Sequence, residues 1–176
     1  MKAKHLITST ILFGFIPIFC NAQTDSKLPN PNKFNHFSIG FQICQYQKDF
    51  GVGLQITSPY IIKRMAFRFR ANMQFSDPSW LPYTNLTLSF VNRYMVFQDK
   101  LYVYAEAGGG MIIANRSVSN DAVYGSGFGL FGVEFHPKPP IGFYFEMGGM
   151  GTGARTTVGN SYSNGFILHY GMRFYL

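Results

Sequence analysis

The stretch from Arg64 to Phe75, RMAFRFRANMQF, alternates between apolar and polar side chains almost without a break. Successive side chains of a β-strand point to opposite faces of the sheet, so this segment is expected to have one aromatic face and one cationic face. A water-soluble sheet would bury the phenylalanines and expose the arginines. A barrel in a membrane would do the reverse, with phenylalanine against lipid and arginine inside. The rest of the chain has to decide between the two.

The same two-residue period recurs along the chain, and no helical period competes with it. It is present in eight segments: 37–44, 50–57, 64–75, 86–90, 101–110, 131–135, 143–148 and 166–176. Eight such segments predict an all-β fold, namely an eight-stranded antiparallel up-and-down barrel.

The polar faces of these segments combine glycine with charges of both signs. Glycine weakens a strand and has no use on a water-facing surface, whereas a narrow barrel interior needs small residues beside large ones. Buried charges require partners. We therefore expect the phenylalanines to face lipid, which makes the barrel a transmembrane one. We expect the interior to hold a charge network of Arg68, Arg70, Arg93, Arg173, Glu106, Glu134 and Glu146.

The composition agrees with a surface that does not face water. Charged residues make up 13% of the chain and aromatic residues 18%, against about 25% charged residues in ordinary soluble domains. The formal net charge is +7, but the basic residues are scattered singly along the strands. Together with the export signal described next, this scatter argues against nucleic acid as a partner.

The N-terminal residues have the three regions of a secretory signal. Lys2 and Lys4 precede an apolar run over residues 6–19, and Cys20-Asn21-Ala22 provides small residues for cleavage. We expect a signal peptide over 1–22, a flexible leader over 23–35 and the barrel domain over 36–176. A lipoprotein anchor on Cys20 is the less favoured alternative, because the bulky Phe19 precedes it. After cleavage Cys44 is alone, so no intrachain disulfide is expected.

The joins between the expected strands differ in length at the two ends of the barrel. SPYIIK, VFQDK and HPKPPI are short, whereas SDPSWLPYT, residues 115–126 and residues 152–165 are longer, with only the join near YQKD short on that side. Short turns at one rim and long loops at the other are typical of outer-membrane barrels. The longer joins contain the expected outer-loop contact residues: Arg116 and Arg155, suited to anionic lipopolysaccharide, and Trp80 and Tyr83, suited to an interfacial aromatic belt.

The C-terminal FILHYGMRFYL has apolar side chains at every second position back from Leu176 and resembles the terminal recognition strand of Gram-negative outer-membrane proteins. LYVYAEAGGG and GFGLFGVEF are similar to the inner strands of small barrels of the OmpX/OmpA type. The resemblance covers roughly residues 36–176. It implies a location in the outer membrane of a Gram-negative bacterium, insertion by the barrel-assembly machinery, and contact with outer-membrane lipid and lipopolysaccharide.

The best catalytic candidate is His36-Phe37-Ser38, because residues two apart on a strand share a face and a nearby glutamate would orient the imidazole. The pair is similar to the site of the lipid A deacylase family, which uses histidine, serine and glutamate. That family has asparagine after the serine, where this chain has Ile39. Both residues also fall on the inward parity, away from membrane lipid. We therefore expect interior hydrogen bonding here and no catalysis.

Other reactive side chains are also expected to be structural. His169 and Arg173 share the inward face, His136 is expected in a solvated turn beside Pro137, and Cys44 projects inward. No metal or cofactor is therefore expected. The sequence favours a non-enzymatic outer-membrane barrel that acts in envelope structure or through its outer loops. The alternatives are a lipid A-modifying enzyme and a secreted soluble barrel that binds an apolar ligand inside.

Overall fold

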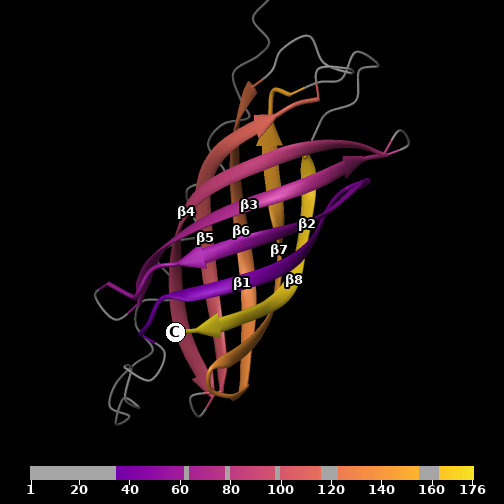
Figure 1. Cartoon of the computed structure of the whole chain (residues 1–176). Helices are drawn as coiled ribbons and strands as arrows, with labels where there is room; N and C mark the ends of the chain where they lie inside the picture. Colours follow the sequence, from indigo (N-terminus) through magenta and orange to yellow (C-terminus); the bar gives the residue numbers. More distant parts are fainter. Residues whose placement is uncertain (1–34, 62–63, 78–79, 98–99, 116–122, 155–162) are drawn as a thin grey trace, which may run out of the picture.

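The computed structural model describes residues 35–61, 64–77, 80–97, 100–115, 123–154 and 163–176. They form eight strands: β1 (Ser38–Tyr46), β2 (Asp49–Thr57), β3 (Met65–Ser76), β4 (Leu81–Phe97), β5 (Leu101–Ile113), β6 (Val123–Lys138), β7 (Ile141–Thr152) and β8 (Gly165–Tyr175). Each strand pairs antiparallel with the next in sequence, and β8 returns to β1, as Figure 1 shows. The predicted fold class is confirmed. Among the described residues, none forms a helix long and apolar enough to cross a membrane.

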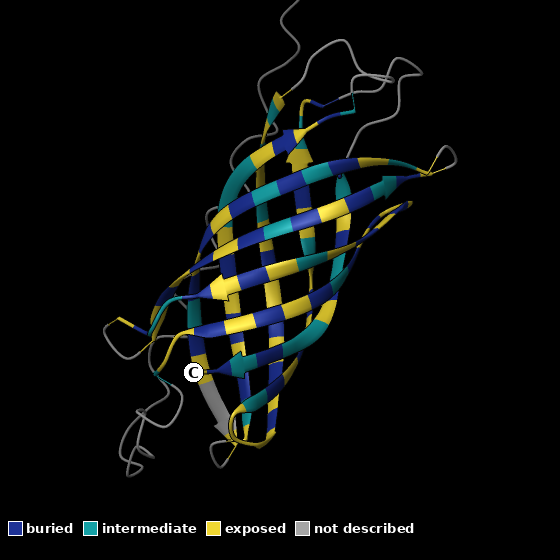
Figure 2. Ribbon diagram, viewed as in Figure 1, coloured by how far each residue is buried: buried dark blue, intermediate teal, exposed yellow. Residues whose placement is uncertain are grey.

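The arginines of β3 point into the barrel and its phenylalanines point outward. Phe67 and Phe69 are 41% and 44% exposed, whereas Arg68 and Arg70 are each 1% exposed. The same alternation of buried and exposed residues runs along the other strands in Figure 2. Closure of the sheet leaves no unpaired edge, so each strand has only an inner and an outer face. In this barrel the inner face contains the charged and most of the polar side chains, with an apolar cluster among them, and the outer face is mainly apolar.

The two ends of the barrel differ in what they contain. We call the end with the start of β1 and the finish of β8 the terminal end; it also contains the joins β2–β3, β4–β5 and β6–β7. The opposite end, the loop end, contains the joins β1–β2, β3–β4, β5–β6 and β7–β8. The β3–β4 join is shorter than expected, because Pro82 and Tyr83 belong to β4 and pair with Phe75 and Gln74.

Glycines of the inner face lie close against side chains or against the backbone of a neighbouring strand. A Cβ added at Gly132 would lie 2.2 Å from the Tyr104 ring, and one at Gly53 would lie 1.9 Å from the Asn72 amide. Interior crowding therefore accounts for the glycines on the polar faces. The outer face of β6 and β7 has glycines of another kind, whose added Cβ would meet no atom closer than 3.7 Å: Gly125, Gly127, Gly129, Gly149 and Gly151.

Candidate functional site

The centre of the barrel is a closed network of arginine and glutamate, in which Glu146 of β7 is the hub. Arg70 donates to both Glu146 oxygens at 2.8 and 2.9 Å, Arg173 donates at 2.8 Å and Arg68 at 3.0 Å. The Tyr104 hydroxyl donates at 2.6 Å. The side chains of all three arginines are at most 1% exposed. The carboxylate thus accepts bonds from β3, β5 and β8 and ties together strands distant in sequence.

Two further glutamates complete the network. Glu106 of β5 accepts from Arg68 at 2.6 Å, from both terminal nitrogens of Arg70 and from the Ser89 hydroxyl at 2.6 Å. Glu134 of β6 accepts from Arg173 at 2.6 Å and from the Tyr175 hydroxyl at 2.5 Å. Three arginines therefore meet three glutamates in a bonded and charge-balanced cluster. Such pairing offsets the large cost of removing each charge from water.

Arg93, the fourth arginine expected in the network, lies apart from this cluster towards the terminal end. Its guanidinium carbon is 3.8 Å from the Tyr60 ring centroid and 4.5 Å from that of Tyr102. Among the described residues, no glutamate lies within ion-pair distance of it. Arg93 is still inward and 7% exposed. Stacking on the two tyrosines replaces the expected carboxylate pairing.

His136 is not in a solvated turn, contrary to expectation. β6 continues to Lys138, so His136 keeps the inward parity of Glu134 and is 2% exposed. Its ring contacts those of Tyr102 and Tyr175, with centroids 5.1 Å apart in each case, and its Nε2 lies 3.4 Å from Glu134. These rings fill the interior at the terminal end.

The half of the interior nearer the loop end is filled by amides, tyrosines and apolar side chains. The His169 ring lies between the Glu146 carboxylate and the Tyr46 hydroxyl, each 3.1 Å from one ring nitrogen. Cys44 is fully buried and accepts from the Gln74 amide at 2.9 Å. Cys44 also belongs to an apolar cluster that includes Ile112, Leu130, Met150 and Ile167. The gap beside Tyr46, Arg70 and His169 has no room for a molecule the size of water.

Tyr83 does not belong to an exposed aromatic belt. It points into the barrel, is 3% exposed, donates to Asp49 at 2.5 Å and lies 2.8 Å from the Ser163 hydroxyl. Tyr83 lies at two-residue spacing from the inward Asn85 and Thr87, and this spacing in the sequence could have predicted that it points inward. Trp80 is 65% exposed at the loop end, with its ring 6.4 Å from that of Phe75. Arg116 and Arg155 lie outside the described residues, as do the expected signal peptide and most of the leader.

The pair weighed as a catalytic site is not assembled. His36 precedes β1 and is exposed, so it does not share the inward face of Ser38, which is 2% exposed. The predicted parity of His36 was wrong because the strand begins only at Ser38. No group of three histidine, cysteine or carboxylate side chains suited to a metal ion occurs within the described ranges.

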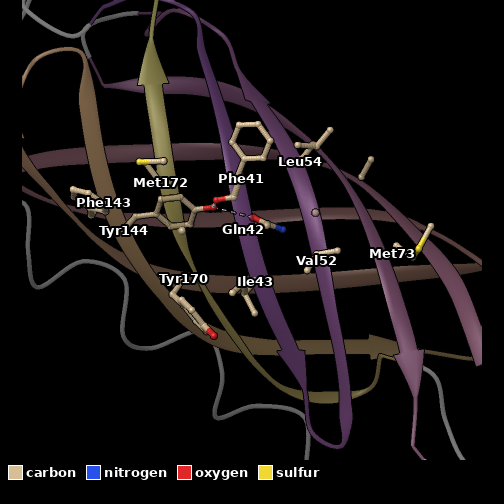
Figure 3. A pocket seen from close by; sticks show the side chains of 13 residues that line it. Phe41, Gln42, Ile43, Val52, Leu54, Met73, Phe143, Tyr144, Tyr170 and Met172 are labelled. Atoms are coloured by element: carbon tan, nitrogen blue, oxygen red, sulfur yellow. Dashed lines mark hydrogen bonds between the residues drawn. The ribbon is translucent and has the colours of Figure 1, made fainter. Parts of the chain in front are cut away.

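The outer face has a hollow, shown in Figure 3, that crosses strands β7, β8, β1, β2 and β3. It measures about 820 Å³ and its outward-facing lining includes Phe41, Val52, Leu54, Met73 and Met172. Beneath it the Tyr144 hydroxyl donates to Gln42 at 3.2 Å, inside the wall. Hydrocarbon chains are the chemistry that matches such a lining.

The arrangement as a whole separates two kinds of chemistry across one layer of backbone. Inside, arginines and glutamates bond each other, and the gap beside Arg70 and His169 has no room for water; outside, aromatic and aliphatic side chains cover the strands. A scan of the chain against models of known protein families finds no match, and neither does a comparison with curated proteins.

Proposed function

We propose that this chain is an integral outer-membrane β-barrel protein without enzymatic activity, and that it serves envelope structure or surface contact through its loop-end joins. Hydrocarbon would surround the outer face, and the loop end would face the cell exterior. In this view the protein resembles small barrels of the OmpX/OmpA type in architecture. Its partners would be outer-membrane lipid, lipopolysaccharide and, during insertion, the barrel-assembly machinery.

The facing of the strands supports this proposal most strongly. Phe41, Leu54, Phe90 and Phe131 are each at least 51% exposed on four different strands, whereas the arginines of the central network are sealed inside. In water the exposed rings and aliphatic chains would cost roughly 25 cal/mol per Å² of apolar surface. In hydrocarbon that cost disappears, while the paired charges stay out of contact with lipid.

The outward position of the apolar side chains and the inward position of the charges also count against a soluble barrel that binds an apolar ligand inside. Such a barrel needs an apolar lumen and a wettable outer surface. Here the centre of the lumen contains Arg68, Arg70 and Glu146, bonded to each other. An apolar guest would have to displace this network without replacing its hydrogen bonds.

The experiment that tests the proposal is fractionation followed by a gel assay. We expect the mature protein in the outer-membrane fraction, extracted only by detergent and not by high salt or carbonate. Closed barrels resist unfolding in cold dodecyl sulfate, so the unheated sample should migrate differently from the boiled one. Recovery as a free periplasmic protein without detergent would overturn the proposal.

A separate measurement tests the absence of enzymatic activity. We expect the lipid A mass spectrum to be the same in cells with and without the protein. Exposed His36 and buried Ser38 support this expectation because they do not share a face. A difference in acyl chain number that depends on Ser38 would contradict it, and Ser38→Ala in the same cells is the control for such dependence.

A further inference from the structure

Three exposed basic residues surround the terminal end of the barrel, and each lies in or next to a different join. Arg64 ends the β2–β3 join, Lys100 lies in the β4–β5 join and Lys138 ends β6 before the turn into β7. We call these three residues the basic collar. Their placement on three separate joins distributes positive charge around the rim instead of along one strand.

Few carboxylates offset the basic collar. Among the described residues the three glutamates are buried in the central network and Asp49 is 6% exposed at the loop end, which leaves Asp77, also at the loop end, as the exposed carboxylate. The same joins contain Lys63 and Asp99, which lie outside the described residues. By sequence, these joins together with Lys138 contain four basic side chains and one acidic side chain.

The interior adds to this positive charge. The three-to-three balance of the central network leaves Arg93 as an additional cation on the terminal side. The Arg93 backbone N–H donates to the Arg64 carbonyl at 2.9 Å, which places the two residues side by side in the wall. Tyrosine rings flank the guanidinium, and among the described residues no carboxylate lies within ion-pair distance of it.

The basic collar lies immediately beyond the apolar outer surface. The Arg64 guanidinium carbon is 5.0 Å from the ring centroid of Tyr94, which is 43% exposed. Phe97 and Phe135, 55% and 47% exposed, precede Lys100 and Lys138 by three residues each. Aromatic side chains followed by basic ones match the order of a bilayer boundary, where the acyl region gives way to phosphate.

We propose that the basic collar binds the phosphates of anionic phospholipid head groups in the leaflet next to the terminal end. This inference rests on the proposed function, because it requires the barrel to lie in a bilayer. In that orientation the short joins and both ends of the barrel domain face the periplasm, where the adjoining leaflet consists of phospholipid. A basic side chain near an anionic bilayer gains enough attraction to change an association constant about fivefold.

The test compares lipid selectivity in reconstituted bilayers. The mature chain is inserted into phosphatidylcholine vesicles that contain a trace of spin-labelled phosphatidylglycerol or spin-labelled phosphatidylcholine, and the fraction of motionally restricted label is measured. We expect the barrel to retain phosphatidylglycerol about threefold or more over phosphatidylcholine, with the preference falling as salt rises. The triple variant Arg64→Gln, Lys100→Gln, Lys138→Gln should reduce the ratio to about one.

Lys48→Gln is the matched control, since Lys48 is exposed in the β1–β2 join at the opposite end. It should leave the selectivity unchanged. Equal selectivity in the triple variant and the unmodified chain would overturn the inference, as would a loss in the control alone. Every sample is first checked for insertion by its heat-dependent gel migration. A chain that fails to insert contradicts the proposed function, whereas a chain that inserts without selectivity contradicts only the basic collar.

Discussion

Single residues in this barrel are constrained by what lies directly opposite them inside. Glu146 shows this most clearly, because three arginines, a tyrosine and a histidine bond one carboxylate. Three positive and three negative charges cancel in this cluster, so removal of any one of them leaves a net buried charge. Each member is therefore worth more to stability than an exposed ion pair, because its loss leaves charges buried without a counterion.

Glu146→Gln should lower the free energy of unfolding by about 3–5 kcal/mol, since it removes a negative charge from the middle of Arg68, Arg70 and Arg173. Urea titration of the protein in detergent micelles, followed by the gel shift of the folded form, measures the change. Met147→Leu alters the neighbouring outward-facing residue and should cost under about 1.5 kcal/mol. A loss below about 1 kcal/mol for the glutamine variant would mean that the network contributes little.

The two kinds of glycine allow a matched comparison. Gly132→Ala should destabilise by about 1–3 kcal/mol, because the new methyl group meets the Tyr104 ring and the interior has no space to absorb it. Gly127→Ala adds the same methyl group to the outer face, where no atom lies closer than 4.0 Å. There it should be neutral or stabilise by up to about 1 kcal/mol. Equal effects of the two variants in urea titration would contradict the crowding of the interior.

At the scale of the strand, the alternation of apolar and polar residues predicts most of the strand positions. β3 could be read directly from RMAFRFRANMQF, and repetition of its period eight times predicted the number of strands. The extents of β4 and β6 could not be read in the same way. Pro82 interrupts one pattern, and the outward glycines Gly125, Gly127 and Gly129 remove the apolar half of the other. Backbone pairing with neighbouring strands maintains both segments where side chains give no signal.

The sequence predicted which side chains of the candidate site point inward, but it did not predict which of them form ion pairs with each other. Parity alone assigned Arg68, Arg70, Arg173 and the three glutamates to the interior, and the structure brings these six together. Which arginine meets which glutamate depends on the stagger of strands across the lumen, and this stagger is a property of the closed sheet. Parity did not reveal that Arg93, opposite Tyr104 in the register, stacks on Tyr60 and Tyr102 and does not join the cluster.

Phe69→Arg tests the outer face of β3 at mid-strand. Arginine facing hydrocarbon at mid-depth should cost about 2–4 kcal/mol and reduce the folded fraction recovered in bilayers. Phe69→Leu keeps the side chain apolar and serves as the control. The folded fraction is read from the gel shift after insertion into vesicles. If Phe69→Arg instead raised solubility without loss of fold, the outer face would be in contact with water.

The whole molecule is a tube closed in the middle. The arginine–glutamate network spans the lumen, and the rings of Tyr102, Tyr175 and His136 fill it at the terminal end. Eight strands leave an interior only wide enough for side chains. This geometry favours a role in structure and contact over passage of solutes.

Planar bilayer recordings should therefore show none of the stable, stepwise conductance typical of wide porins. The unmodified chain in bilayers is compared with protein-free bilayers and with a porin of known conductance under the same salt. The closed lumen is the physical reason for the expected result. A steady conductance of porin size would show that the network opens in a membrane.

The seam between β1 and β8 also constrains the order of events in assembly. Nine consecutive residues, Ser38 to Tyr46, find their partners in the last strand of the chain, from Tyr175 back to Ile167. β1 is synthesised first, and its hydrogen bonds to β8 can form only after β8 has been synthesised. Until then the backbone N–H and C=O groups along the free edges of β1 and β8 have no strand partner, and the proposed lipid environment would offer them no hydrogen bonds. Closure of the barrel therefore comes after the synthesis of β8, as the last step in forming the sheet.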